Sequence, residues 1–301
     1  MAGLVADGRW VGIDLGGDRS TTVLQSGEII RSELGGHDTP SLVAFKARDR
    51  SIGEAAVPLV TSAPRNTIGA VRTLAGTLYS SWSQRTLTEH VAFRHVEASD
   101  GHPQGRVAVS VERKNGTQTI GGTEILAMYL GKLRECASAT HAPGDAGKTI
   151  GCFSSPVAAS AVERRAVLDA ARIAGFADAK IFPASDCLCA VYARKHPVAP
   201  GSNPETVIMV DVGQLQTTVV GVNTSSAGCP YSVLGVRSDE ELGASHFDGK
   251  MFQHFREAVK KKYSHDVVPG SKQGLRLLIA CRRLRELLST TPTAETAVEV
   301  R

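Results

Sequence analysis

The sequence predicts an α/β protein built from two related halves. Segments with the pattern of strands alternate with segments with the pattern of helices along the whole chain, the order typical of α/β architecture. An Asp-x-Gly hairpin occurs twice, with Asp14 and Gly16 in residues 10–24 and with Asp211 and Gly213 in residues 207–222. Each copy is an apolar strand, a tight turn with the aspartate at its tip, and a second strand. The repeat indicates a duplicated domain with a cleft between its halves, where backbone N–H groups of both hairpins can hold phosphate.

Length and composition favour a soluble globular protein of one large or two medium domains. The 301 residues include 34 basic and 30 acidic side chains, and the net charge of +4 is too small to indicate a nucleic-acid partner. No apolar run approaches the roughly 20 residues that a membrane span needs. Residues 1–8 are too short and too weakly apolar for a signal peptide. The six cysteines lack a zinc-binding spacing and are interpreted as buried free thiols, so a cytoplasmic location fits best.

Most predicted elements lie in the first two hundred residues. Strand patterns occur at residues 28–30, 41–45, 107–111, 118–120, 149–153 and 180–183. Residues 51–56 are expected to open a helix and Thr123 to cap another, and further helices are expected from Ser160 to Gly175 and at residues 187–193. The strongest of these signals is the capping box of Ser160 and Glu163, followed by Gly175, the residue type usual just after a helix. Ser185 is expected to cap the last helix.

A loop at residues 196–205, rich in Pro, Gly, Ser and Asn, is the best candidate boundary between lobes. We therefore expect lobe I at residues 1–200 and lobe II at residues 201–301. Beyond the second hairpin, the pattern predicts a strand at 231–236, a helix with Phe247, Met251, Phe255 and Val259 on one stripe, a helix burying Leu277, Cys281, Leu284 and Leu288, and a strand at 297–300. Lobe II has about half the residues of lobe I, so we expect it to be incomplete and the chain to be a fragment or a truncated gene product.

A series of short blocks occurs in a fixed order over nearly all of residues 10–301. They are GIDLG at 12–16, TPSLVAF at 39–45, IGEAA at 52–56, NTI at 66–68, ERRAVLDAA at 163–171, IAG at 173–175, VDVG at 210–213, LGxxxFD at 242–248 and ACxxL at 280–284. Together they resemble the nucleotide-binding domain of the 70-kilodalton heat-shock chaperones. The form VDVGQ, without a glycine triplet, is most similar to the divergent 110-kilodalton branch. Each block alone is weak, and the common order makes the resemblance specific.

The resemblance implies the actin-like ATPase fold, in which duplicated ribonuclease-H-like lobes enclose a central cleft for ATP or ADP and Mg²⁺. It implies that Asp14 and Asp211 organise metal-bound water, the usual way in which carboxylates act on Mg²⁺. Arg72 falls where the family has a catalytic Lys beside the γ-phosphate, so Arg72 and Asp211 are the catalytic candidates. The remaining candidates for nucleotide contact are Gly16, Gly17, Asp18 and Gly213 in the phosphate turns, and Arg285 and Ser289 on the adenosine-contacting helix.

Several positions depart from the family pattern. Ala184 stands where the family has a Glu near the metal and the attacking water, and residues 214–216 (Gln-Leu-Gln) replace glycines and a Thr in the second phosphate loop. Asp18 replaces a neutral hydroxyl residue, and a like charge about 4 Å from phosphate opposes binding by about 1 kcal/mol in water. Because phosphoryl transfer needs positioned water, metal and fixed charge together, efficient ATP turnover is not expected.

Three further departures concern arginine. Arg72 in place of Lys keeps the charge and changes the donor geometry. On the adenosine side, Arg282 replaces a Glu and Glu286 replaces an Arg, and we expect these two to form an i, i+4 pair along the helix. Arg285 replaces a Lys.

The leading hypothesis is an ATP-binding chaperone or co-chaperone that assists protein folding. It would bind ATP weakly and dock a partner heat-shock 70 chaperone to promote nucleotide exchange, with unfolded proteins as clients. One alternative is an active ATPase that drives a peptide-binding domain absent from this chain. Another is a scaffold that binds no nucleotide and works through protein contacts alone.

Overall fold

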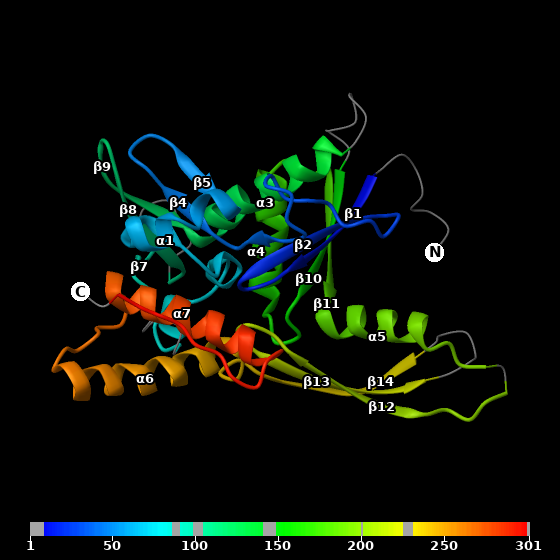
Figure 1. The fold of residues 1–301 in the computed structure, drawn as a ribbon. Helices are drawn as coiled ribbons and strands as arrows, with labels where there is room; N and C mark the ends of the chain where they lie inside the picture. Colours follow the sequence, from blue (N-terminus) through cyan, green and yellow to red (C-terminus); the bar gives the residue numbers. More distant parts are fainter. Residues whose placement is uncertain are drawn as a thin grey trace.

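A computed structural model describes residues 9–85, 91–98, 105–140, 149–199, 201–224 and 231–299. Within these ranges the chain has the predicted α/β architecture, with helices packed against several β-sheets (Figure 1). Among the described helices, none combines the length and the apolar character needed to cross a membrane.

The largest sheet lies in the first half and has the strand order β11-β10-β1-β2-β3. Strand β1 (Arg9–Leu15) pairs in parallel with β10 (Thr149–Ser155), and β10 pairs in parallel with β11 (Asp178–Pro183). On the other side β1 forms the predicted hairpin with β2 (Arg19–Leu24), which pairs with β3 (Thr39–Pro40). Buried and partly exposed residues alternate along β10, as the two-residue period of a strand requires. This pairing brings the ends of β1 and β10 side by side.

Helices α3 (Gly122–Ala139) and α4 (Ala161–Ile173) pack on each other and share one apolar core with the sheet. Val11 and Ile13 of β1, Phe153 of β10 and Leu130 of α3 belong to this core and are almost fully buried. The capping box predicted for α4 is present, since Ser160 Oγ accepts a bond from the Glu163 N–H and Glu163 Oε2 accepts one from the Ser160 N–H. Gly175 follows α4 with a φ of +84°, which favours glycine.

Shorter elements complete the first half. They are β4 (Val43–Phe45), β5 (Arg50–Ile52), α1 (Leu59–Ser62), β6 (Thr67–Ile68), α2 (Tyr79–Trp82), β7 (Arg94–Glu97), β8 (Val107–Arg113) and β9 (Gly116–Gly121), with 3₁₀-helices at Gly53–Ala56, Pro64–Asn66 and Val71–Leu74. The last 3₁₀-helix carries Arg72. It packs under the start of α3, where a β-carbon on Gly122 would lie 2.2 Å from the Leu74 carbonyl oxygen.

The second half contains a three-stranded antiparallel sheet and a pair of helices. The sheet order is β12 (Thr206–Val212), β13 (Thr217–Thr224) and β14 (Tyr231–Asp239), and β12 with β13 is the second predicted hairpin. Helix α5 (Ala184–Lys195) contacts both this sheet and strands β10 and β11 of the first half (Figure 1). Helices α6 (Ala244–Tyr263) and α7 (Lys272–Leu288) pack around Phe252 and Cys281, and α7 also contacts α1. The division into lobes at residue 200 stays a prediction.

Some predicted elements are wrong. Helix α5 begins at Ala184 directly after β11, so Ser185 lies inside the first turn and does not cap the helix. Residues 28–30 form only an isolated bridge, between Val23 and Ile29. In the described residues 297–299 no strand forms, since none of the described strands pairs with them.

The apolar stripes predicted for the last two helices are wrong at one residue each, which is exposed instead of buried. Phe247 in the first turn of α6 is 51% exposed, and Leu288 at the end of α7 is 44% exposed, because both lie beyond the part of the helix that meets its partner. Among the cysteines, Cys187 is exposed, contrary to the expectation of buried thiols, whereas Cys189 and Cys281 are buried. Burial raises the pKa of Cys281 to about 11. Cys229 lies outside the described residues.

Candidate functional site

The two hairpins bring Asp14 and Asp211 together. Asp14 is the last residue but one of β1, and its Oδ1 accepts a 2.6 Å hydrogen bond from Ser154 Oγ on the neighbouring strand β10. Ser154 Oγ in turn accepts a bond from the Leu15 N–H, which fixes both side chains. Burial, and then the negative charge of Asp14, raises the pKa of Asp211. The two carboxylates therefore lie close enough to repel each other across the cleft.

This pair of carboxylates fits a hydrated Mg²⁺ ion. A divalent cation between them would relieve the repulsion that raises the pKa of Asp211, and Mg²⁺ keeps several of its waters when bound by one or two carboxylates. The described residues hold no group of three or more His, Cys, Asp or Glu side chains that could bind a metal directly. Contact of Asp14 and Asp211 with Mg²⁺ through water stays a prediction.

A side chain at Gly16, Gly17 or Gly213 of the two turns would meet different neighbouring atoms. A β-carbon on Gly16 would lie 2.1 Å from the Arg19 carbonyl oxygen, and one on Gly213 would lie 3.2 Å from that of Gln216. The first turn therefore needs the small residue in order to close, whether or not phosphate binds, whereas at Gly213 a shift of a few tenths of an ångström would relieve the contact. A β-carbon on Gly17 would instead lie 2.5 Å from Cδ1 of Leu215. The open side of the first turn is thus covered by a side chain from the second.

The second loop is held firmly in this position. The Gly213 N–H donates to the Gln216 carbonyl, and the first N–H groups of α6, on Ala244 and Ser245, donate to the carbonyls of Gly213 and Gln214. Gly243 also packs closely here, because a β-carbon on it would lie 2.6 Å from the Gln216 nitrogen. The backbone of residues 213–216 is therefore anchored to α6.

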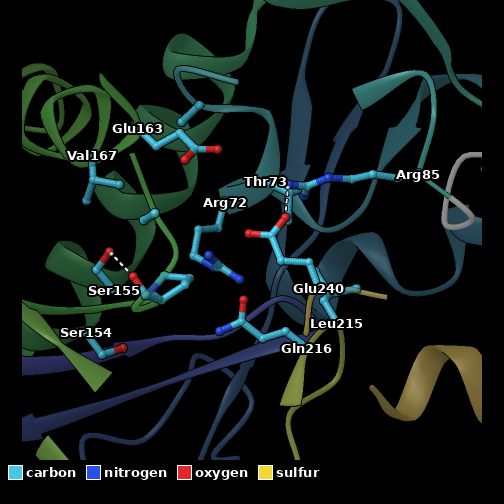
Figure 2. Close-up of a pocket in the computed structure, with 13 residues that line it drawn as sticks. Arg72, Thr73, Arg85, Ser154, Ser155, Glu163, Val167, Leu215, Gln216 and Glu240 are labelled. Atoms are coloured by element: carbon cyan, nitrogen blue, oxygen red, sulfur yellow. Dashed lines mark hydrogen bonds and ion pairs between the residues drawn. The ribbon is translucent and has the colours of Figure 1, made fainter. Parts of the chain in front are cut away.

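Arg72 points from the first half into a small polar pocket (Figure 2). The pocket has a volume of about 40 Å³, and its lining includes Ser154, Ser155, Glu163, Leu215, Gln216 and Glu240. The guanidinium is directed toward Gln216 of the second loop. Burial, and then the nearby Arg85, lowers the pKa of Arg72 to about 10, so the group stays charged at neutral pH. Its Nε is buried without a hydrogen-bond partner in the described structure.

A second, much larger pocket has a volume of about 1080 Å³. Residues of both halves line it, with apolar walls that include Val57, Val60, Phe93, Leu275, Leu278 and Ile279. Its polar residues include Asp18, Arg19, Asp248, Arg282 and Glu286. Leu215 lines both pockets.

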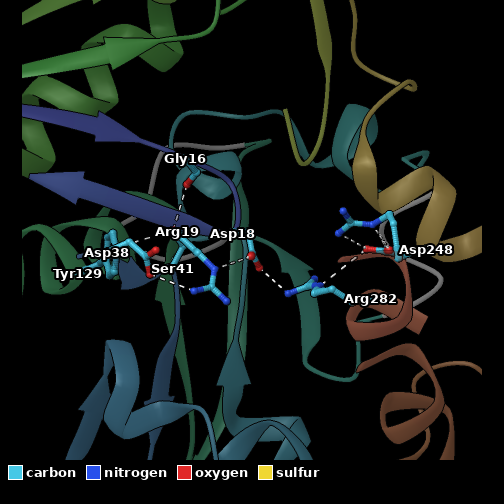
Figure 3. Close-up of polar contacts among 9 residues, drawn as sticks. Gly16, Asp18, Arg19, Asp38, Ser41, Tyr129, Asp248 and Arg282 are labelled. Atoms are coloured by element: carbon cyan, nitrogen blue, oxygen red, sulfur yellow. Dashed lines mark hydrogen bonds and ion pairs between the residues drawn. The ribbon is translucent and has the colours of Figure 1, made fainter. Parts of the chain in front are cut away.

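A chain of charged groups crosses between the halves at the large pocket (Figure 3). Asp18 Oδ1 lies 2.6 Å from Arg282 Nη1 on α7, and Asp18 Oδ2 lies 3.3 Å from Nε of Arg19. Arg282 also lies 3.7 Å from Asp248, whose side chain is 2% exposed. Two expectations are therefore corrected. The charge of Asp18 is balanced by two guanidinium groups, and Arg282 pairs with aspartates of two other elements instead of with Glu286.

Arg285 lies on α7 and Ser289 directly follows this helix, and neither residue lines either pocket. Arg285 Nε donates a 2.6 Å bond to Asp248, and Ser289 Oγ donates to the Glu286 carbonyl at the end of the helix. Their contact with adenosine stays a prediction. The sequence-based reasoning missed Ser154 and Asp248. The available signals were the position of Ser154 just after a predicted strand and the acidic residue at the end of the LGxxxFD block.

Comparison with known proteins gives one consistent answer. The family model described as Hsp70 protein matches residues 10–301. The chain is 26% identical to Heat shock 70 kDa protein 14 of Arabidopsis thaliana, over 96% of this chain and 34% of that protein. It is 28% identical to a heat shock protein homolog of Saccharomyces cerevisiae, over 96% and 41%. It is 30% identical to a ribosome-associated molecular chaperone of Eremothecium gossypii, over 96% and 45%. The chain thus spans less than half the length of these relatives.

Proposed function

Because this chain belongs to the Hsp70 family, we propose that it is the nucleotide-binding part of a cytoplasmic chaperone or co-chaperone. Its fold is the actin-like ATPase fold of that family. In our proposal lobe I (residues 1–200) and an incomplete lobe II (residues 201–301) hold ATP or ADP with Mg²⁺ and hydrolyse ATP slowly. The protein assists the folding of client proteins by docking an Hsp70 chaperone and promoting release of its nucleotide.

The observation that supports nucleotide binding is that Asp14 lies close enough to both Asp211 and Arg72 to affect their pKa values. The two carboxylates come from the two hairpins, and Asp14 is close enough to Arg72 to favour its charged form. Carboxylates for hydrated Mg²⁺ beside a fixed cation for phosphate are the parts that phosphoryl-transfer proteins use. Mg²⁺ would supply neutralisation of the phosphate charge, while these side chains position its water shell.

Two features support slow turnover. Ala184, the first residue of α5, has no carboxylate to orient an attacking water. Leu215 covers Gly17 in the first turn, so phosphate cannot approach that backbone without a side-chain movement. Losing a single positioned group in an active site typically costs a factor of about 10²–10³ in rate.

Calorimetric titration with MgATP tests the binding step. We expect saturable binding that weakens about tenfold in Asp14→Asn and in Asp211→Asn, since each change removes half of the carboxylate pair. Asp49→Asn is the matched control, because Asp49 is exposed and its carboxylate has no recorded bond or ion pair in the described structure. Absence of binding to the unmodified chain would contradict the proposal and leave the scaffold alternative.

Single-turnover hydrolysis tests the catalytic step. We expect slow hydrolysis that rises about 10²-fold in Ala184→Glu, which adds a carboxylate at the start of α5, at the lower end of the range of general base catalysis. Ala190→Glu adds the same charge to an exposed position of α5 and should leave the rate unchanged. Turnover equal to that of an ordinary family ATPase would contradict slow catalysis and favour the active-ATPase alternative.

The exchange role is tested by the release of fluorescent ADP from an Hsp70 chaperone. We expect release to accelerate with the concentration of this protein and to saturate. An unchanged release rate at saturating protein, in a preparation that binds MgATP, would rule out the exchange role while leaving nucleotide binding intact.

A further inference from the structure

Leu215 lies at the junction of the two pockets in the cleft. It lines the small pocket with Arg72 and the large pocket with Asp18 and Arg282. Its Cδ1 and Cγ lie 2.5 and 2.7 Å from the place where a β-carbon on Gly17 would be. The side chain therefore occupies the space that the glycine leaves open, between the first turn and the second loop.

The side chain can leave this place only by rotation. The backbone on both sides of Leu215 is tied by the bond from the Gly213 N–H to the Gln216 carbonyl and by the bonds from the start of α6. Thr217 Oγ1 adds a 2.6 Å bond to the Leu242 carbonyl. A backbone held at this many points resists displacement, whereas a leucine side chain changes between staggered rotamers.

The two pockets offer different chemistry on either side of Leu215. The small one, of about 40 Å³, has the charged Arg72 with its unpartnered Nε, and it has room for a few water molecules or the end of an anionic group. The large one, of about 1080 Å³, has apolar walls and accommodates a ring system the size of a nucleoside. A ligand with an aromatic ring and an anionic tail must pass between Gly17 and Leu215 to use both.

We propose that Leu215 determines which ligands the cleft accepts, by separating the phosphate side from the nucleoside side. The inference rests on the proposed nucleotide-binding function and specifies it further. A nucleoside fills the large pocket while Leu215 stays in place. A nucleoside triphosphate binds only when Leu215 rotates away from Gly17, so its affinity is lowered relative to that of the nucleoside.

The test is calorimetric titration of the unmodified chain and of Leu215→Ala with adenosine and with MgATP. Alanine removes Cγ and both Cδ atoms and keeps Cβ, which lies 3.8 Å from the place that a β-carbon on Gly17 would take. We expect MgATP to bind about tenfold more tightly to Leu215→Ala, whereas adenosine changes by less than about twofold. Leu234→Ala, at an exposed position of β14, is the control and should change neither affinity.

A second measurement examines the contact without a ligand. Gly17→Ala should lower the melting temperature of the unmodified chain, because the new β-carbon would collide with Leu215, and should lower it much less in Leu215→Ala. An unchanged ratio of ATP to adenosine affinity in Leu215→Ala, with both ligands binding, overturns the inference and leaves the proposed function standing. If neither the unmodified chain nor Leu215→Ala binds MgATP or adenosine, both the inference and the proposed function are overturned.

Discussion

Asp211 lies where burial and a neighbouring charge both oppose its ionisation. Its pKa is raised by burial and by the charge of Asp14, so the folded state prefers the protonated form. Stability associated with that preference is complete below the unfolded pKa of about 3.9 and is lost as the pH rises through the higher folded value. The charge of Asp14 opposes the ionisation of Asp211.

Asp211→Asn should therefore raise the melting temperature at pH 7 in the absence of Mg²⁺. The difference from the unmodified chain should vanish toward about pH 3, where Asp211 is protonated in both folded and unfolded states. Thermal unfolding followed by circular dichroism at a series of pH values measures this. Asp49→Asn should show no such trend, and a lower melting temperature for Asp211→Asn at pH 7 would contradict the repulsion.

Arg72 carries a similar cost. Burial lowers the pKa of Arg72 to about 10, and its Nε lacks a partner in the part of the chain that the structure describes. Arg72→Met fills the same space without charge, so it should leave the melting temperature unchanged or higher. It should weaken the binding of MgATP about tenfold and leave the affinity for adenosine unchanged. Paired melting and titration measurements check both effects. Equal loss of ATP and adenosine affinity would show that Arg72 does not face phosphate.

At the scale of elements, the halves are joined by ion pairs as well as by apolar packing. Asp18 of the first turn reaches Arg282 of α7 across 264 positions of sequence, and Asp248 of α6 holds Arg282 and Arg285. Asp18 and Arg282 are partly exposed, with side-chain exposures of 25% and 37%. Asp248 is buried, and breaking its pairs leaves charged groups unbalanced in the interior.

Asp18→Asn should consequently destabilise the chain by no more than about 1 kcal/mol, and the effect should shrink in 1 M salt. Asp248→Asn should lower the free energy of unfolding by about 3 kcal/mol, because Arg282 and Arg285 lose the buried charge that balances them. This loss should depend less on salt than that of Asp18→Asn. Urea unfolding at two salt concentrations measures both. Asp266→Asn removes the 2.8 Å pair with Arg256 inside the second half and should not loosen the contact between α7 and the first turn.

At the scale of the whole molecule, one face of the second sheet is apolar and exposed. Ile208, Val210 and Val212 on β12 are 70%, 62% and 55% exposed, whereas Val207 and Met209 on the opposite face pack toward Cys189 of α5. An apolar strip of this kind promotes association of a soluble chain.

Changing both Ile208 and Val210 to Thr, a residue equally suited to strands, should raise solubility and lower the fluorescence of an apolar dye, with little change in melting temperature. Val207→Thr is the matched control. It should lower the melting temperature by placing a hydroxyl against the packed face, and it should not improve solubility. Light scattering during heating checks both variants.

The sequence by itself determined the fold class and the ends of the best-marked elements. The two Asp-x-Gly hairpins, the capping box of Ser160 and the turn at Gly175 depend on residues a few positions apart, so local chemistry is enough to predict them. The collinear blocks identified the family, which the match over residues 10–301 confirms. The sequence also indicated that larger side chains at residues 214–216 occupy space that glycines leave open in the family pattern.

Only the tertiary structure decided which distant groups meet. Arg282 pairs with Asp18 and Asp248 instead of with Glu286, because the packing of α7 brings its guanidinium next to the first turn and to α6. Ser154 reaches Asp14 through the parallel pairing of β1 and β10. Leu215 packs on Gly17 because the start of α6 holds its loop. Hairpins and helix caps are set by residues that are neighbours in the sequence, whereas these contacts form only when separate elements pack together.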